Sequence, residues 1–288
     1  MERYYQIAGL CLRIHGNDEE LYTDDGILTE YRRGPGVWDH SVTLAFRDQI
    51  PEPTGRLCYE TPGMWVYEDG DRVLTYFGVS AQKPEESYMV ICRQDRENQV
   101  WMKHNRNDDR IYPKTVLKAM ELEHLLTRHD TLLFHSTFIE VDGKAILFTA
   151  PSGVGKSTQA ELWCRYRNAR LINGDRTGIQ WRADAPWACG VPFSGSSDVR
   201  HNETWPLAAI VCLSQAPVNT LTRLRGVRAF RQIWEGCTVH LWDRADVEQA
   251  TQTVTRILGH VPVYALACTP DASAVEVLYQ QLTKEKVL

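Results

Sequence analysis

Long apolar segments and a surplus of basic residues are both missing from this chain of 288 residues. No stretch approaches the roughly 20 consecutive apolar residues that a membrane-spanning helix needs, so no membrane association is expected. The first residues, Met1-Glu2-Arg3-Tyr4, lack the basic start and apolar core of a secretory signal. The net charge is −5 and no long basic run occurs, which argues against nucleic acid as the main partner.

The cysteines also lack a pattern. Eight are present, but no two are spaced as C-x-x-C, the arrangement typical of many zinc and redox sites. Cys92 and Cys212 lie within apolar, strand-like runs. The expected state is a set of reduced, buried thiols in a cytoplasmic protein, rather than a disulfide framework.

What is present is an apolar content of 43%, enough for the core of one large domain or of two smaller ones. Residues 1–112 are rich in alternating apolar and polar residues, and Asp69-Gly70 separates two such runs as a hairpin turn would. This part is predicted to be a β-rich N-terminal module, whose role the residues do not disclose. A helix is predicted to begin at Pro113 and to include Leu126. From there to residue 288, strands alternate with helices, so residues 113–288 are predicted to form an α/β domain.

The most informative stretch follows an apolar run at residues 145–149. It reads Ala150-Pro151-Ser152-Gly153-Val154-Gly155-Lys156-Ser157-Thr158 and leads into a helical pattern. Glycines let consecutive backbone N–H groups converge on a phosphate at a helix N-terminus, as in the P-loop (Walker A motif). The full pattern has a glycine where this chain has Ala150. A glycine turn before an ordinary helix is the alternative interpretation.

The P-loop interpretation predicts a nucleotide site for ATP and Mg²⁺. Lys156 would reach the β- and γ-phosphates, and the Ser157 hydroxyl would bind Mg²⁺. The predicted nucleotide-binding residues are Ser152, Gly153, Val154, Gly155, Lys156, Ser157, Thr158 and the more distant Arg200.

A hairpin is predicted directly before this loop. Residues 134–141 and 144–149 are strand-like, and Asp142-Gly143 is a two-residue turn between them. If the pairing continues along both strands, His135 falls opposite Ala150, at the mouth of the loop. His135 is therefore a candidate catalytic residue, although an isolated histidine can equally be structural. Because the loop strand is antiparallel to its predecessor, we expect a mixed sheet.

Two further candidates follow the loop helix. Asp175 comes after the apolar run at residues 169–172, where a second Mg²⁺ contact or a catalytic base is expected, although Asn173-Gly174-Asp175 is also good turn chemistry. Arg200 lies at the end of a long polar loop, residues 190–202, and is either a phosphate contact or a solvated arginine.

Several of these blocks together resemble a known family. Phe134-His135-Ser136, the segment 140–144, the loop 150–158, Ile172-Asn173-Gly174-Asp175-Arg176 and the segment 190–197 are similar to the catalytic domain of HPr kinase/phosphorylase and of related kinases found beside peptide-modifying gene cassettes. The similarity covers roughly residues 113–284 and does not extend to residues 1–112.

The resemblance implies the mixed-sheet fold shared with phosphoenolpyruvate carboxykinase and an ATP-dependent serine kinase. It places Lys156 and Ser157 at the phosphates and Mg²⁺, His135 at the histidine before the loop hairpin, and Asp175 at the second acid of an Asp-Asp pair. Gly174 stands where the family has the first acid. This departure argues against the reverse, phosphate-driven reaction and against HPr itself as the substrate.

The sequence therefore favours a cytoplasmic kinase that transfers the γ-phosphoryl group of ATP to a hydroxyl group, with a serine of a peptide or small protein as acceptor. Two alternatives stay open at this point. One is a nucleotide-binding switch or peptide-binding module without transfer, and the other is a small-molecule kinase of the same fold. Whether the chain forms a homo-oligomer also stays open.

Overall fold

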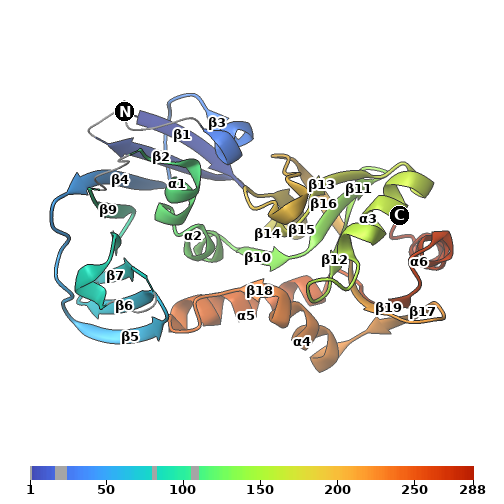
Figure 1. Ribbon diagram of the computed structural model, residues 1–288. Helices are drawn as coiled ribbons and strands as arrows, with labels where there is room; N and C mark the ends of the chain where they lie inside the picture. Colours follow the sequence, from blue (N-terminus) through green and yellow to red (C-terminus); the bar gives the residue numbers. More distant parts are fainter. Residues whose placement is uncertain (1, 17–24, 80–82, 105–109) are drawn as a thin grey trace. The chain divides into compact units, whose positions relative to one another are not determined.

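The computed structural model describes residues 2–16, 25–79, 83–104 and 110–288. The chain divides into two compact units, Met1–Leu122 and Glu123–Leu288, each described by itself below (Figure 1). Both units contain a mixed sheet, and helices accompany both sheets. None of the described helices combines the length and the apolar character that crossing a lipid bilayer requires.

The first unit is built on one sheet that has nine strands among the described residues. Its strand order is β3-β1-β2-β4-β9-β8-β7-β6-β5, and β4 runs parallel to both of its neighbours. Asp69-Gly70 joins β6 to β7, as the hairpin signal predicted. The strands are β1 (Glu2–Ile7), β2 (Leu10–Gly16), β3 (Arg32–Arg33), β4 (His40–Arg47), β5 (Arg56–Thr61), β6 (Met64–Asp69), β7 (Arg72–Phe77), β8 (Met89–Gln94) and β9 (Glu97–Lys103), with short 3₁₀ turns η2 (Gly26–Tyr31) and η3 (Pro84–Glu86).

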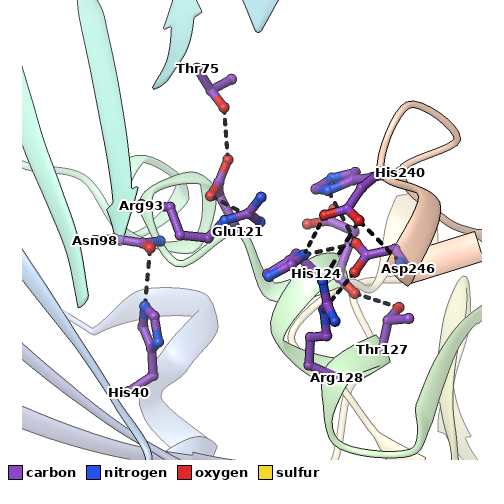
Figure 2. Close-up of polar contacts among 12 residues, drawn as sticks. His40, Thr75, Arg93, Asn98, Glu121, His124, Thr127, Arg128, His240 and Asp246 are labelled. Atoms are coloured by element: carbon purple, nitrogen blue, oxygen red, sulfur yellow. Dashed lines mark hydrogen bonds and ion pairs between the residues drawn. The ribbon is translucent and has the colours of Figure 1, made fainter. Parts of the chain in front are cut away.

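The helix predicted from Pro113 through Leu126 is interrupted. It forms two short helices, α1 (Pro113–Ala119) and α2 (Leu122–Arg128), because Glu121 adopts a left-handed conformation with φ 46°. Figure 2 shows the buried Glu121 carboxylate between two side chains of the sheet. Thr75 donates a hydrogen bond to it (3.0 Å), and Arg93 Nη1 lies 3.6 Å from its other oxygen. These tertiary contacts override the helical pattern.

The boundary between the units also lies later than residue 112. Helix α1 belongs to the first unit, where the buried Asn98 side chain of β9 donates a hydrogen bond to the Ala119 carbonyl (2.9 Å). The oxygen of the same amide accepts a hydrogen bond from His40 Nε2 of β4 (3.0 Å). The end of α1 is thus tied to two strands of the first sheet, which the local pattern at Pro113 could not indicate.

The second unit is organised around the long strand β16, which pairs antiparallel with β15 in its first part and parallel with β12 and β19 further on. The strand order is β13-β11-β12-β16-β15-β14-β10-β18, and β19 lies against β16 and β17. The mixed sheet that the hairpin predicted is therefore confirmed. The strands are β10 (Thr131–His135), β11 (Thr137–Val141), β12 (Lys144–Thr149), β13 (Arg170–Asn173), β14 (Arg176–Arg182), β15 (Ala185–Gly190), β16 (Thr204–Gln215), β17 (Thr220–Leu224), β18 (Cys237–Thr238) and β19 (Val263–Cys268).

Helices cover both faces of this sheet (Figure 1). Successive side chains of a strand point to opposite faces, so Ala145 and Leu147 of β12 pack with α4 and α5, whereas Ile146 and Phe148 pack with α3 and α6. The result is a helix–sheet–helix sandwich with two apolar cores. The helices are α3 (Lys156–Arg167), α4 (Gly226–Gly236), α5 (Arg244–Leu258) and α6 (Ala272–Lys284), and a short 3₁₀ turn, η4 (Gly195–Ser197), lies in the 190–202 loop.

The predicted hairpin is only partly correct. Val141 pairs with Lys144 as expected, and the ladder runs as far as Thr137 opposite Phe148. It then ends, because the chain bends at Ser136, whose amide donates to the Asp175 carbonyl (3.0 Å) and whose hydroxyl bonds Thr177 (2.9 Å). The preceding residues form the separate strand β10, which pairs with β14.

The predicted pairing of His135 with Ala150 is therefore wrong. His135 pairs with Arg176 of β14 instead. Its backbone still lies beside the end of β12, because the Thr149 hydroxyl donates a hydrogen bond to the His135 carbonyl (2.9 Å).

Candidate active site

The segment 150–155 joins the end of β12 to the start of α3. Gly153 and Gly155 have φ values of 79° and 121°, a region of backbone conformation that favours glycine. A Cβ added to either residue would meet no described atom within 4 Å apart from its chain neighbours, so the space beside each glycine is open. No described side chain caps the N-terminus of α3. The first N–H groups of this helix are thus available to an anion, together with the partial positive charge of the helix end.

The Lys156 side chain lies across this loop. Its ammonium group donates a hydrogen bond to the Ala150 carbonyl (2.9 Å), and the side chain is half-buried. Burial lowers the pKa of Lys156, and the nearby Asp175 carboxylate opposes that shift. An ammonium group that is partly removed from water and held by one carbonyl oxygen is well placed to exchange that contact for a phosphate.

The structure also brings His135 and Asp175 together. His135 Nε2 lies 3.7 Å from Asp175 Oδ1, and each side chain is about one-third exposed (35% and 34%). Burial, followed by the positive charge of Lys156, lowers the pKa of His135, while Asp175 opposes the shift. A neutral imidazole is therefore favoured at neutral pH. Because Lys156 acts electrostatically on His135 and interacts with Asp175, the three predicted residues form one electrostatically connected group.

Asn173 and Arg176 belong to the same group and were not predicted. The buried Asn173 side chain accepts hydrogen bonds from the amides of Asp175 (3.0 Å) and Arg176 (3.1 Å), and donates one to the Val191 carbonyl (2.7 Å). This fixes the turn that presents Asp175. The Asn-Gly-Asp sequence is typical of a turn, and that signal could have identified Asn173. Arg176 Nε lies 3.7 Å from Asp175 Oδ2 and gave no signal of its own.

The 190–202 loop folds over Asp175. A Cβ added to Gly195, which has φ 58°, would lie 2.8 Å from the Asp175 Cβ. A Cβ added to Gly174 would lie 1.8 Å from Ser197 Oγ. The turn at Ser197 therefore occupies the space that the side chain of an acid at position 174 would need in this conformation.

Arg200 is not brought to the 150–158 segment. Its guanidinium group donates to the Asp198 carboxylate and to Ser194 Oγ (3.0 Å), both in its own loop. Ser157 and Thr158 are exposed on the first turn of α3, and Ser152 is exposed before it. No contact joins Ser157 to Asp175 among the described residues.

A cavity of about 530 Å³ opens beside the same loop. The loop is tied to this side by Gln215, whose amide donates to the Val154 carbonyl (3.3 Å). The volume is within the range of about 300–1,000 Å³ that small-molecule sites occupy. The cavity is lined by Gly153, Val154, Gly155, Thr158, Gln159, Leu213, Gln215, Ala216, Pro217, Cys268, Thr269 and Pro270.

Comparison with known proteins finds distant structural similarity among solved structures. No protein-family model matches the chain, and no curated protein matches it. Among solved structures, the Hpr(Ser) kinase/phosphatase from Coxiella burnetii is similar with a TM-score of 0.33 and 12% sequence identity, over 54% of this chain and 97% of that one. The assignment of a function therefore depends on the residues of the chain itself.

Proposed function

We propose that this protein is an ATP-dependent kinase that transfers the γ-phosphoryl group to a hydroxyl group, with a serine of a peptide or small protein as acceptor. The observation that carries the proposal is the grouping of an open glycine loop at a helix N-terminus with Lys156, Asp175 and His135. Phosphoryl transfer depends mainly on positioning and charge neutralisation, which such a set would supply. The acceptor class comes from the resemblance to the HPr kinase family.

The proposal places ATP in this site in one orientation. The phosphates would lie in the 150–155 loop, where the space at Gly153 and Gly155 is open and the α3 amides are uncapped. The nucleoside would then enter the adjoining cavity beside Thr158 and Ala216. Lys156 would leave the Ala150 carbonyl and bind the phosphates.

The same site offers oxygen ligands that suit Mg²⁺, namely the exposed Ser157 hydroxyl and the Asp175 carboxylate. A bound Mg²⁺ would neutralise the phosphate charge. Asp175 would accept the proton of the acceptor hydroxyl or hold the metal. The neutral His135 would orient Asp175 or contact phosphate.

We place this activity in the cytoplasm. All eight cysteines are free in the structure, and several are buried, as Cys189 and Cys212 are. Free thiols are maintained in the reducing compartment, where ATP is also available.

The second candidate function is a nucleotide-binding switch or peptide-binding module that does not transfer phosphate. The packing of Ser197 against Gly174 favours it, because this chain has one carboxylate where the kinase family has two. The two functions differ in whether a labelled γ-phosphate reaches an acceptor.

The test is a γ-phosphate labelling assay on serine peptides, including those encoded near the gene, run beside an ATP-binding titration. Asp175→Asn keeps the side-chain shape but removes the charge, so transfer should fall about 10²–10⁴-fold. ATP binding should change little, because Lys156 and the loop amides remain.

Asp184→Asn is the matched control, since Asp184 is an exposed turn residue between β14 and β15 of the same unit. It should leave both transfer and binding unchanged. If the unmodified protein binds ATP but labels no acceptor, the kinase proposal fails and the switch takes its place. If Asp175→Asn transfers phosphate normally, Asp175 is neither the base nor a metal ligand.

A further inference from the structure

Two histidines and an aspartate from three separate segments converge in the second unit. His124 is on α2, His240 follows β18, and Asp246 is in the first turn of α5. One ligand atom from each residue lies within 4.8 Å of the other two. Figure 2 shows the three side chains together, with Arg128 beside the Asp246 carboxylate. None of these residues belongs to the candidate active site described above.

The separations between these atoms suit a single small cation. His124 Nδ1 lies 2.8 Å from Asp246 Oδ2, and His240 Nδ1 lies 3.7 Å from the same oxygen. Around a tetrahedral Zn²⁺ with bonds of about 2.0–2.1 Å, neighbouring ligand atoms are roughly 3.3 Å apart. The two distances to Asp246 lie on either side of that value, and each would change by about half an ångström to seat the ion. The ligand atoms of the two histidines lie within 4.8 Å of each other.

Two further residues are placed to support the site. Arg128 Nε lies 3.0 Å from Asp246 Oδ1, which leaves Oδ2 facing the histidines. Asp243 caps α5 through Oδ1, which accepts hydrogen bonds from the amides of Ala245 and Asp246. Its other oxygen lies 3.8 Å from His124 Nδ1 and could provide a fourth ligand. Partners of this kind orient the ligands of metal sites.

An ion-pair network without metal is the simpler interpretation, because Asp246 is fully buried and already has Arg128 and His124 beside it. That network does not explain His240. Its Nδ1 is a buried atom that has no hydrogen-bond partner among the described residues. Its ring is stacked on His124 and on Trp242, so the nitrogen is held near Asp246 at a distance too long for a hydrogen bond.

We propose that His124, His240 and Asp246 bind a Zn²⁺ ion. Two imidazoles and one carboxylate are a typical ligand set for Zn²⁺, whereas Mg²⁺ and Ca²⁺ prefer oxygen ligands alone. The ion would join α2, the segment after β18 and the start of α5. The proposal is independent of the kinase function, because it uses none of the residues assigned to the nucleotide.

The experiment uses the full chain after treatment with EDTA. Zn²⁺ is titrated in competition with a chromophoric chelator, and Co²⁺ is added in parallel to look for the visible absorption of a tetrahedral site. The wild type should bind one equivalent of Zn²⁺, show the Co²⁺ bands and gain in Tm with Zn²⁺.

His240→Phe keeps a stacked ring but removes the ligand nitrogen. Loss of a residue that only supports a ligand lowers metal affinity roughly 10–100-fold. Loss of a ligand should therefore lower the Zn²⁺ affinity of this variant by more than that, and its Co²⁺ bands should disappear. His260→Phe is the matched control, because His260 is an exposed histidine of the same unit that contacts Trp181. It should bind Zn²⁺ as the wild type does.

The proposal is overturned if the wild type binds no stoichiometric Zn²⁺. It is also overturned if the wild type binds Zn²⁺ no better than the His240→Phe variant, once circular dichroism has shown that this variant is folded. The cluster is then an ion-pair network only. Asp246→Asn gives an independent check at a second ligand: retention of full Zn²⁺ affinity by the folded variant would equally exclude the site.

Discussion

Replacing Gly174 by alanine perturbs the packing of the 190–202 loop over the candidate active site. Gly174 has no positive φ, so its backbone accepts an alanine, and any cost must come from the added methyl group. That methyl would lie 1.8 Å from Ser197 Oγ and 2.6 Å from Ser197 Cβ. The second atom cannot rotate away, so the turn at Ser197 itself must move.

The cost can be estimated from this displacement. Overpacking a protein core by one methyl group typically destabilises it by about 1–3 kcal/mol, and the lower end of that range applies here because the turn at Ser197 is exposed. Moving Ser197 also disturbs two hydrogen bonds, one from its hydroxyl to the Ser194 carbonyl (2.8 Å) and one from the Val199 amide to its hydroxyl (3.3 Å). We therefore expect Gly174→Ala to lower the free energy of unfolding by an amount within that range.

A double-mutant cycle isolates the contact. Gly174→Ala is measured by urea unfolding in the native background and in a Ser197→Gly background, where the obstructing Cβ is gone. In the second background the cost should fall below about 0.5 kcal/mol. Gly34→Ala is the control, because a Cβ at Gly34 meets no atom of the described residues within 4 Å, and it should change the stability by no more than about 0.5 kcal/mol.

An equal cost of Gly174→Ala in both backgrounds would refute the reasoning. Ser197 would then not occupy the space beside Gly174. The explanation for why this chain has no acid at position 174 would have to be sought elsewhere.

Two other predictions concern the cavity and the thiols. Ala216→Trp should fill the cavity beside the loop and weaken ATP binding. Inorganic triphosphate has no nucleoside and should bind as before. If a titration shows an equal loss of affinity for both ligands, the orientation proposed for ATP is contradicted. Burial raises the pKa of Cys189 to about 11 and that of Cys212 to about 12, so at pH 8 the Cys189 thiolate fraction is only about one in a thousand. A thiol reagent at that pH, followed by peptide mapping, should label the partly exposed Cys11 and Cys58 first, and early labelling of Cys189 or Cys212 would contradict the burial.

Local signals predicted much of the second unit. The Asp142-Gly143 turn is confirmed, because it depends on residues close together in the chain. These signals act over a few residues, and the structure follows them where no distant contact competes.

Contacts between distant segments could not be predicted in the same way. The bend at Ser136 depends on hydrogen bonds to Asp175 and Thr177, which belong to another part of the sheet. His135 consequently reaches Asp175 through the β10–β14 pairing, and not through the hairpin on which its prediction was based.

The histidine cluster gave no sequence signal for the same reason. His124 and Asp246 are 122 positions apart, and no short ligand spacing joins them. Their meeting depends on how α2 and α5 pack in the second unit. Similarly, the interruption of the helix at Glu121 depends on Thr75 and Arg93, which lie on strands of the first sheet.

The central claim is that residues 150–158 bind the phosphates of ATP, and calorimetric titration of ATP into the Lys156→Ala variant tests it most directly. Lys144→Ala serves as the control, because Lys144 is at the opposite end of β12, where it donates to the Val287 carbonyl. Loss of a charge-assisted phosphate contact is worth roughly 1.5–3 kcal/mol, so Lys156→Ala should bind ATP about ten- to a hundredfold more weakly. Lys144→Ala should bind as the wild type does. Unchanged affinity in Lys156→Ala, or no ATP binding by the wild type, would mean that the glycine loop is a structural turn before an ordinary helix.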